Sequence, residues 1–149
     1  MQTFLPYPSF QASAECLDTK RLGKQRVEAK QIITALTNPA YGWQHHPAVN
    51  MWRGHLGALK LYANAMIDEW VHRGWKNTME LYRVGVHEPR DMPAWLGDPA
   101  FHASHRSNLL RKDPAFYAQY DWDETPFLPY VWPTPAPDNL TDKEVLYAH

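Results

Sequence analysis

The sequence has few of the residues that thiol chemistry or a membrane span requires. Only one of its 149 residues is a cysteine, Cys16, which excludes an intramolecular disulfide and a multi-thiolate metal site. No apolar run approaches the roughly 20 residues of a membrane-spanning helix. The first ten residues lack the basic and long apolar parts of a signal peptide. We therefore expect a soluble, cytoplasmic protein with no membrane partner.

A strong net charge and a glycine-rich phosphate loop are also missing. The formal net charge is −1, so bulk charge does not indicate a nucleic-acid coat protein. The distribution is uneven, however, because residues 1–112 carry 14 of the 15 Lys and Arg and only 9 of the 16 Asp and Glu. A basic body with an acidic tail is compatible with a polyanion held on one face.

Helical periodicity is the main structural signal that the sequence does contain. Apolar residues recur at three- and four-residue steps over residues 18–37 and 47–72, which predicts two long helices. A short helix is predicted over residues 76–85, and a further helix over 99–112 with one or two turns after it. No period-two pattern indicates a strand, so the sequence predicts an all-α fold.

The length suits one compact helical domain spanning residues 1–149. Five prolines between positions 126 and 137 prevent a long regular element there. Phe127, Tyr130 and Trp132 nevertheless give this stretch apolar surface to bury. We predict that residues 126–149 form an irregular tail, rich in proline and aromatic residues, that wraps the helices.

The stretch "KRLGKQRVEAKQ", residues 20–31, holds five basic residues and one acid, Glu28. On a helix, Arg21, Lys24, Glu28 and Gln31 share one face. One interpretation is an ordinary ion pair between Lys24 and Glu28, which contributes about 0.3–0.5 kcal/mol. The other is a carboxylate held beside a cationic reaction intermediate, with the flanking Lys and Arg side chains bound to a phosphate backbone.

A second polar cluster lies on the helix predicted over residues 99–112. His102 and His105 have a spacing that can hold a metal, but no further ligand is fixed by spacing, so no metal site is predicted. These histidines are expected to bond to phosphates or to buried carbonyls. The donors suited to positioning phosphates are His105, Arg106, Asn108, Arg111 and Lys112. The alternative is a solvated, basic helix end.

Several segments together resemble one family over nearly the whole chain, in the same order: "FLPYPSFQASAECLDTKRLGKQRVEAKQI", "HPAVNMWRG", "WVHRGWKNTM", "HASHRSNLLRKDPAFY" and "LPYVWP". They resemble the bacterial branch of the pyrimidine-dimer DNA glycosylases, the family of the phage endonuclease V. The resemblance implies a compact all-α glycosylase with coupled abasic-site lyase activity. Its substrate is expected to be double-stranded DNA with a damaged pyrimidine or an abasic site. A monomer without a cofactor is expected.

In the chemistry that the resemblance implies, an N-terminal α-amine attacks the sugar C1′ and a glutamate stabilises the cationic sugar. Aligning the first long helix places Glu28 on that glutamate. An α-amine has an ordinary pKa of about 7.7–8.0, so a useful fraction is unprotonated at neutral pH. The phage enzyme exposes a small second residue, whereas the bulk of Gln2 should keep Met1 in place. The nucleophile is therefore Met1, which we favour, or Lys24, or a water activated by Glu28.

Charge and the resemblance together give a set of predicted DNA contacts: Arg21, Arg26, Arg53, His46, His102, His105, Arg106, Arg111, Lys112 and Tyr117, the last as a base-stacking residue. Two other classes of function stay open. One is a hydrolytic glycosylase for another damaged or modified base, with Trp43, His46 or Arg53 lining the pocket. The other is a DNA-binding module without catalysis, in which Glu28 is only an ion-pair partner.

Overall fold

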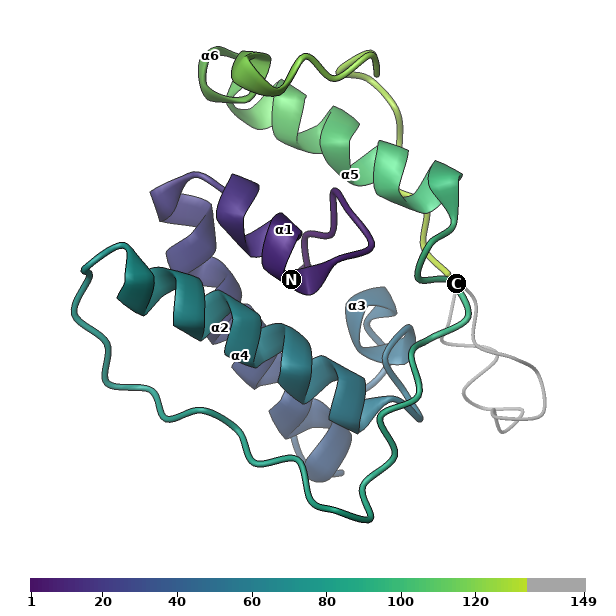
Figure 1. Ribbon diagram of the computed structural model, residues 1–149. Coiled ribbons are helices and arrows are strands. Elements are labelled where there is room, and N and C mark those ends of the chain that lie inside the picture. Colours follow the sequence, from purple (N-terminus) through teal and green to yellow (C-terminus); the bar gives the residue numbers. More distant parts are fainter. Residues whose placement is uncertain (134–149) are drawn as a thin grey trace.

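The computed structural model describes residues 1–133, which form helices joined by loops (Figure 1). In chain order the elements are α1 (Phe10–Cys16), α2 (Thr19–Thr37), α3 (Pro47–Asn50), α4 (Leu56–His72), α5 (Pro99–Lys112), α6 (Pro114–Tyr117) and a 3-10 turn, Ala118–Tyr120. These residues contain no strand, and the all-α prediction is confirmed. Within the same range, no helix combines the length and the apolar character that crossing a membrane requires.

Helix α2 forms close to its predicted bounds and packs against α4, as does the short α1 (Figure 1). Its first turn is capped by Asp18, whose side chain accepts a hydrogen bond from the backbone N–H of Arg21 at 3.3 Å. Leu22 and Ile32 on its inner face are fully buried. Helix α1 was not predicted from the sequence. The Ser9 side chain caps it.

The prediction of one continuous helix over residues 47–72 is wrong, because α3 and α4 are separate. Gly54 lies at φ +86°, a left-handed conformation that interrupts α-helical geometry. The turn that contains it also places Trp52 in the core, where its indole N–H donates to Thr3 Oγ1 at 3.0 Å. The break therefore coincides with a left-handed glycine and a buried tryptophan, and the apolar periodicity did not reveal it.

The short helix predicted over residues 76–85 is also wrong, because this segment is irregular and runs back along α4 (Figure 1). The side-chain amide of Asn64 donates to the Tyr82 carbonyl at 2.9 Å and accepts from the Tyr82 N–H at 2.7 Å. Lys60 binds Glu88 at 2.9 Å further along. These side chains supply the backbone partners that a helix would otherwise provide.

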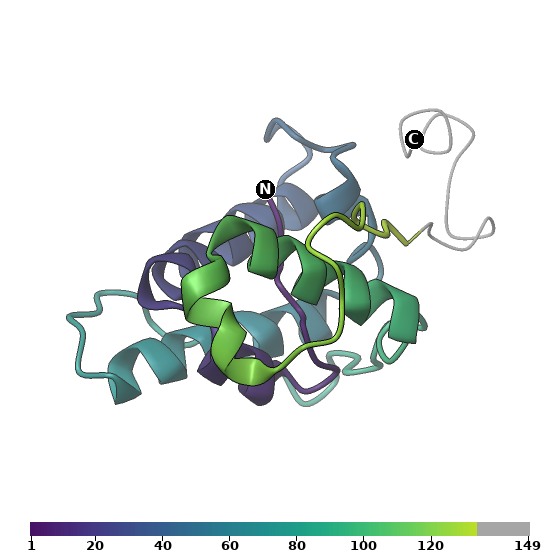
Figure 2. The same cartoon turned by 90° about the horizontal axis from the view of Figure 1, so that it is seen from above.

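The N-terminal segment, residues 1–6, passes between α5 and the layer of α1, α2 and α4 (Figures 1 and 2). A buried extended chain needs partners for its backbone groups, and here buried side chains supply them. Gln25 Oε1 accepts from the Phe4 N–H at 2.9 Å, and the Tyr62 hydroxyl contacts the Phe4 carbonyl at 2.9 Å. These bonds fix the path of the segment that begins at Met1.

Two histidines of α5 hold the same segment from the other side. His105 Nδ1 accepts from the Leu5 N–H at 2.8 Å, and His102 Nδ1 lies 2.7 Å from the Leu5 carbonyl. Because His102 Nε2 accepts from the Gly97 N–H, its proton is on Nδ1 and is donated to Leu5. Their exposed fractions are 2% and 0%, so we do not assign His102 or His105 to the DNA interface.

The burial of His105 predicts an acid-sensitive fold. Burial lowers the pKa of this ring to about 3, whereas an unfolded histidine titrates near 6.5. Between these values only the unfolded chain takes up the proton, so the free energy of unfolding falls as the pH decreases below 6.5. The expected slope from this residue is about 1.4 kcal/mol per pH unit.

Urea unfolding measured between pH 7 and pH 4 tests this expectation. His105→Asn, which can still accept the Leu5 bond without titrating, should flatten the dependence relative to the native protein. The matched control is His72→Asn, at an exposed position, which should leave the slope unchanged. If the free energy of unfolding changed equally with pH in all three proteins, His105 would not be the source of the acid sensitivity.

Residues 121–133 return along α5, held by small polar side chains of that helix. The Leu128 N–H donates to Ser107 Oγ at 2.9 Å, and the Val131 N–H donates to Ser104 Oγ at 3.1 Å. Tyr130 packs edge-on against a buried ring, whereas Phe127 is 79% exposed. Residues 134–149 lie outside the described residues, so the wrapping of the whole tail stays a prediction.

Candidate active site

A cleft of about 290 Å³ opens where the N-terminal segment meets α2, the end of α5 and the returning C-terminal stretch. Its basic residues are Lys20, Arg21, Lys24 and Lys112, and its acid is Glu28. The remaining lining residues are Met1, Gln2, Phe4, Gln25, Tyr130 and Trp132. Arg21, Lys24 and Glu28, which the sequence predicted on one face of α2, all line this cleft, whereas Gln31, the fourth residue of that predicted face, does not. The cleft therefore has the charge of a phosphate-binding site with a carboxylate inside it.

Glu28 lies beside the α-amine of Met1. Its Oε1 is 3.8 Å from the Met1 nitrogen, and its Oε2 accepts from Gln25 Nε2 at 2.6 Å. Burial raises the pKa of the Glu28 carboxyl, although the Met1 ammonium, Lys24 and Lys112 act in the opposite direction. The arrangement places the Met1 amine next to the Glu28 carboxylate in a half-buried position. Of the two groups, it is the carboxylate whose basicity is raised.

Gln25 is a buried site residue that the sequence interpretation missed. It is fully buried, and its amide joins the carboxylate to the N-terminal segment. While Nε2 donates to Glu28, Oε1 accepts from the Phe4 N–H and contacts the Tyr62 hydroxyl at 2.7 Å. The available signal was a polar side chain within the apolar stripe of the helix. A buried amide there must have partners.

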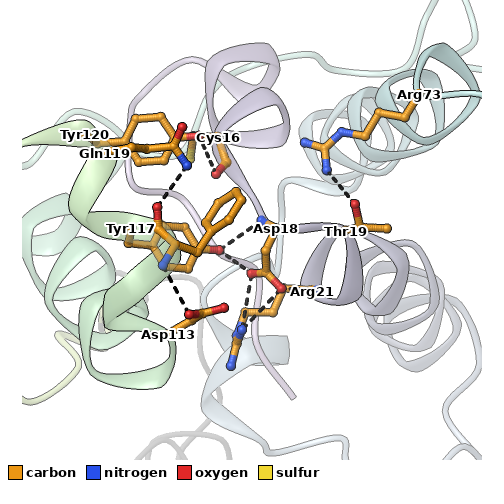
Figure 3. Close-up of polar contacts among 10 residues, drawn as sticks. Cys16, Asp18, Thr19, Arg21, Arg73, Asp113, Tyr117, Gln119 and Tyr120 are labelled. Atoms are coloured by element: carbon orange, nitrogen blue, oxygen red, sulfur yellow. Dashed lines mark hydrogen bonds and ion pairs between the residues drawn. The ribbon is translucent and has the colours of Figure 1, made fainter.

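Arg21 is held at the cleft by a network shown in Figure 3. Asp18 Oδ1 accepts from Arg21 Nη1 at 3.2 Å and from the Tyr117 hydroxyl at 2.5 Å. The Asp18 N–H also donates to the Tyr117 oxygen, at 3.1 Å. Tyr117 is fully buried, so we do not assign it to base stacking. Its contacts instead tie α6 to the start of α2, as Figure 3 shows.

The cleft end of α5 adds further positive charge. Lys112 lines the cleft, and burial together with the neighbouring Arg21 and Arg111 lowers its pKa. Arg111 is exposed and donates to Asn108 Oδ1. Close packing of like charges is unfavourable in the free protein, and a phosphate placed among them would relieve it.

Besides Arg111, three further arginines predicted as DNA contacts do not line this cleft. Their guanidinium groups bond to other parts of the fold: Arg26 to Asn77 at 2.7 Å, Arg53 to the Gln44 carbonyl at 2.6 Å and Arg106 to Glu124 at 2.6 Å. Lys20, one turn before Lys24, lines the cleft and was not predicted. Within residues 1–133, no three His, Cys, Asp or Glu side chains are grouped to hold a metal ion.

Comparison with known protein families identifies the family of this chain. A family model described as pyrimidine dimer DNA glycosylase matches residues 1–83, more than half of the chain. The matched region contains Met1, Gln25, Glu28 and the α1 to α4 helices. Neither the curated proteins nor the solved structures gave a match. The chain therefore belongs to the pyrimidine dimer DNA glycosylase family and is a DNA repair glycosylase.

Proposed function

We propose that this protein is a DNA glycosylase with coupled abasic-site lyase activity, in which the α-amine of Met1 is the nucleophile. The observation that carries the proposal is the 3.8 Å separation between the Met1 nitrogen and Glu28 Oε1, inside a cleft lined by basic residues. The substrate is double-stranded DNA with a damaged pyrimidine or an abasic site. Lys20, Lys24 and Lys112 bind the phosphates on either side of the attacked sugar.

In the first step the unprotonated amine attacks C1′ of the damaged nucleotide. A C–N bond forms to Met1 while the glycosidic C1′–N bond breaks, and the base leaves with the bonding electrons and takes up a proton. Positive charge develops on the sugar in this step. Glu28 lies within ion-pair distance of the attacking nitrogen, so its carboxylate stabilises that charge.

Strand cleavage follows from the same covalent intermediate. The nitrogen then loses one proton, and the C1′–O4′ bond of the sugar ring breaks while O4′ takes up a proton. The product is a protonated Schiff base, which acidifies the C2′ proton. Glu28 takes that proton, the electron pair forms the C2′–C3′ double bond, and the 3′ phosphate leaves. Burial raises the pKa of Glu28 and so makes it a better proton acceptor than an exposed glutamate. Water then hydrolyses the imine and releases the enzyme.

Positioning favours Met1 over Lys24 as the nucleophile. The Met1 side chain is 7% exposed, and the segment that follows it is fixed by buried hydrogen bonds. Lys24 is exposed and carries its amine on a flexible stem, which costs more entropy to hold at C1′. Lys24 therefore suits a phosphate contact better than covalent catalysis.

Borohydride trapping tests the proposal. Protein with its native N-terminus is incubated with a duplex that carries one abasic site, and with the undamaged duplex as the control. A covalent protein–DNA band on the abasic duplex alone, with the adduct mapped to Met1, is the expected result. Absence of the band while the abasic duplex still binds would remove the lyase mechanism and leave a hydrolytic glycosylase or a plain DNA binder.

A further inference from the structure

A second pocket, of about 240 Å³, lies against the same Met1 and Glu28 pair. Its other lining residues are Gln31, Trp43 and His46. This pocket contains no lysine or arginine, whereas the first cleft contains four. The amine and carboxylate therefore lie between a basic cleft and a pocket made of two aromatic rings and an amide.

Trp43 has an unusual backbone for a large side chain. Its φ is +67°, in the left-handed region that bulky residues rarely occupy. Its side chain is 64% exposed, so burial of the indole does not offset this strain. The indole lines the pocket and meets the His46 ring in a T-shaped arrangement with centroids 5.9 Å apart. Strain of this kind concentrates at functional sites.

The surrounding loop keeps Trp43 in this conformation. Gln44 Nε2 donates to the carbonyls of Ala35 at 2.7 Å and Tyr41 at 3.1 Å. The Trp43 carbonyl itself accepts from the His46 N–H at 3.1 Å. The loop is therefore held by several bonds in a geometry that presents an aromatic ring to solvent beside the reacting pair. Such a ring is pre-organised to stack on a planar ligand.

We propose that Trp43, with Gln31 and His46, forms the subsite that receives the nucleobase of the attacked nucleotide. This inference rests on the proposed function, because it places C1′ at the Met1 amine. From C1′ the phosphodiester backbone and the base extend in different directions. The basic cleft suits the backbone, and the pocket with the Trp43 and His46 rings and without lysine or arginine suits the base, which has a π-face but no charge.

The polar groups of the pocket fit the edge of a pyrimidine. His46 Nδ1 accepts from the Ala48 N–H at 3.0 Å, which leaves Nε2 as the protonated nitrogen of the neutral ring. Burial and the Met1 ammonium lower the pKa of His46, so the ring is neutral at pH 7. The Gln31 amide provides a donor and an acceptor. Both side chains can therefore bond to base carbonyls while the indole covers the face.

Two reactions of the same protein test the subsite. The first is base excision from a duplex that carries a cyclobutane pyrimidine dimer, under single-turnover conditions. The second is borohydride trapping on an abasic duplex, which has no base at the attacked sugar. Trp43→Ala should slow excision by about 5- to 150-fold, the range for loss of one base–aromatic stack, and leave trapping within about twofold. Trp43→Phe should recover most of the excision rate.

The matched control is Trp75→Ala, at a half-exposed tryptophan that lines neither pocket. It should leave both reactions unchanged. Unchanged excision by Trp43→Ala would overturn the subsite. Loss of both reactions in Trp43→Ala would overturn the subsite as well. The abasic duplex has no base at the attacked sugar but keeps its opposite strand, so Trp43 would then act on that strand or on the Met1 amine. Native protein that excises the base but gives no trapped band would overturn the amine mechanism alone, and the excision comparison would still decide the role of Trp43.

Discussion

A protein with one extra residue in front of Met1 is expected to trap abasic DNA at least about 100-fold more slowly than protein that begins at Met1. The added residue moves the α-amine by up to about 3.8 Å, the distance between successive Cα atoms. Displacements of about 1 Å already cost on the order of 100-fold when the reacting atoms must meet in one geometry. The segment behind Met1 cannot shift to compensate, because Phe4 and Leu5 are bonded to buried side chains.

The comparison needs two proteins prepared from the same cleavable tag, one cut to leave Met1 first and one cut to leave a single additional glycine. Both should bind an abasic duplex with similar affinity in fluorescence anisotropy, since the proposed phosphate contacts come from α2 and α5. Lys24→Ala, with Met1 first, should weaken binding and still give an adduct on Met1. Full trapping by the extended protein, with the adduct on Lys24, would assign the nucleophile to the lysine.

Glu28→Gln is expected to lower base excision and trapping by about 10²- to 10⁴-fold, the usual contribution of a positioned acid or base. The amide has nearly the same shape and can still accept the bond from Gln25, so the fold and DNA binding should be retained. What it lacks is the negative charge that stabilises the cationic sugar in the proposed mechanism and the ability to take the C2′ proton there. Single-turnover rates on the dimer and abasic duplexes measure both effects.

The pH dependence adds a second readout of the same residue. Because burial raises the pKa of Glu28, the native rate should fall on acidification through a value above the ordinary glutamate pKa of about 4.3. The Glu28→Gln protein should lack this acidic limb. Glu80→Gln, at an exposed glutamate that does not line the cleft, is the matched control and should behave as the native protein does. An unchanged rate in Glu28→Gln would show that Glu28 has no catalytic role, and absence of excision and trapping in the native protein itself would favour a DNA-binding module without catalysis.

The arrangement at Met1 explains why a lone acid occurs within a basic stretch. The cationic side chains of Arg21 and Lys24 line the same cleft as the carboxylate. The partners of Glu28 there are the Met1 amine and Gln25. The ordinary ion pair that the spacing also suggested does not account for these contacts. A surface that only bound phosphate would have no reason to bury part of a glutamate among its cations.

The sequence by itself determined the helical class, the extents of α2 and α5 and the placement of Arg21, Lys24 and Glu28 on one side of α2. Local physics is sufficient for these features. The apolar stripe has the helical period, and Asp18 and Asp98, the latter followed by a proline at the first helical position, cap the two helices. The match to the family over residues 1–83 agrees with the resemblance read from the motifs.

Only the tertiary structure decided which polar residues are interior. His102, His105 and Tyr117 are residue types that DNA-binding surfaces use, yet the Nδ1 atoms of the two histidines bond to the buried N-terminal segment and the Tyr117 hydroxyl bonds to Asp18. Asn64 likewise holds residues 76–85 out of a helix. Most importantly, Met1 and Glu28 are far apart in sequence and meet because Gln25 bonds to both segments. Burial and long-range hydrogen bonds determine which of the locally possible conformations forms and which side chains become interior. The spacing of residues in the sequence does not reveal this outcome.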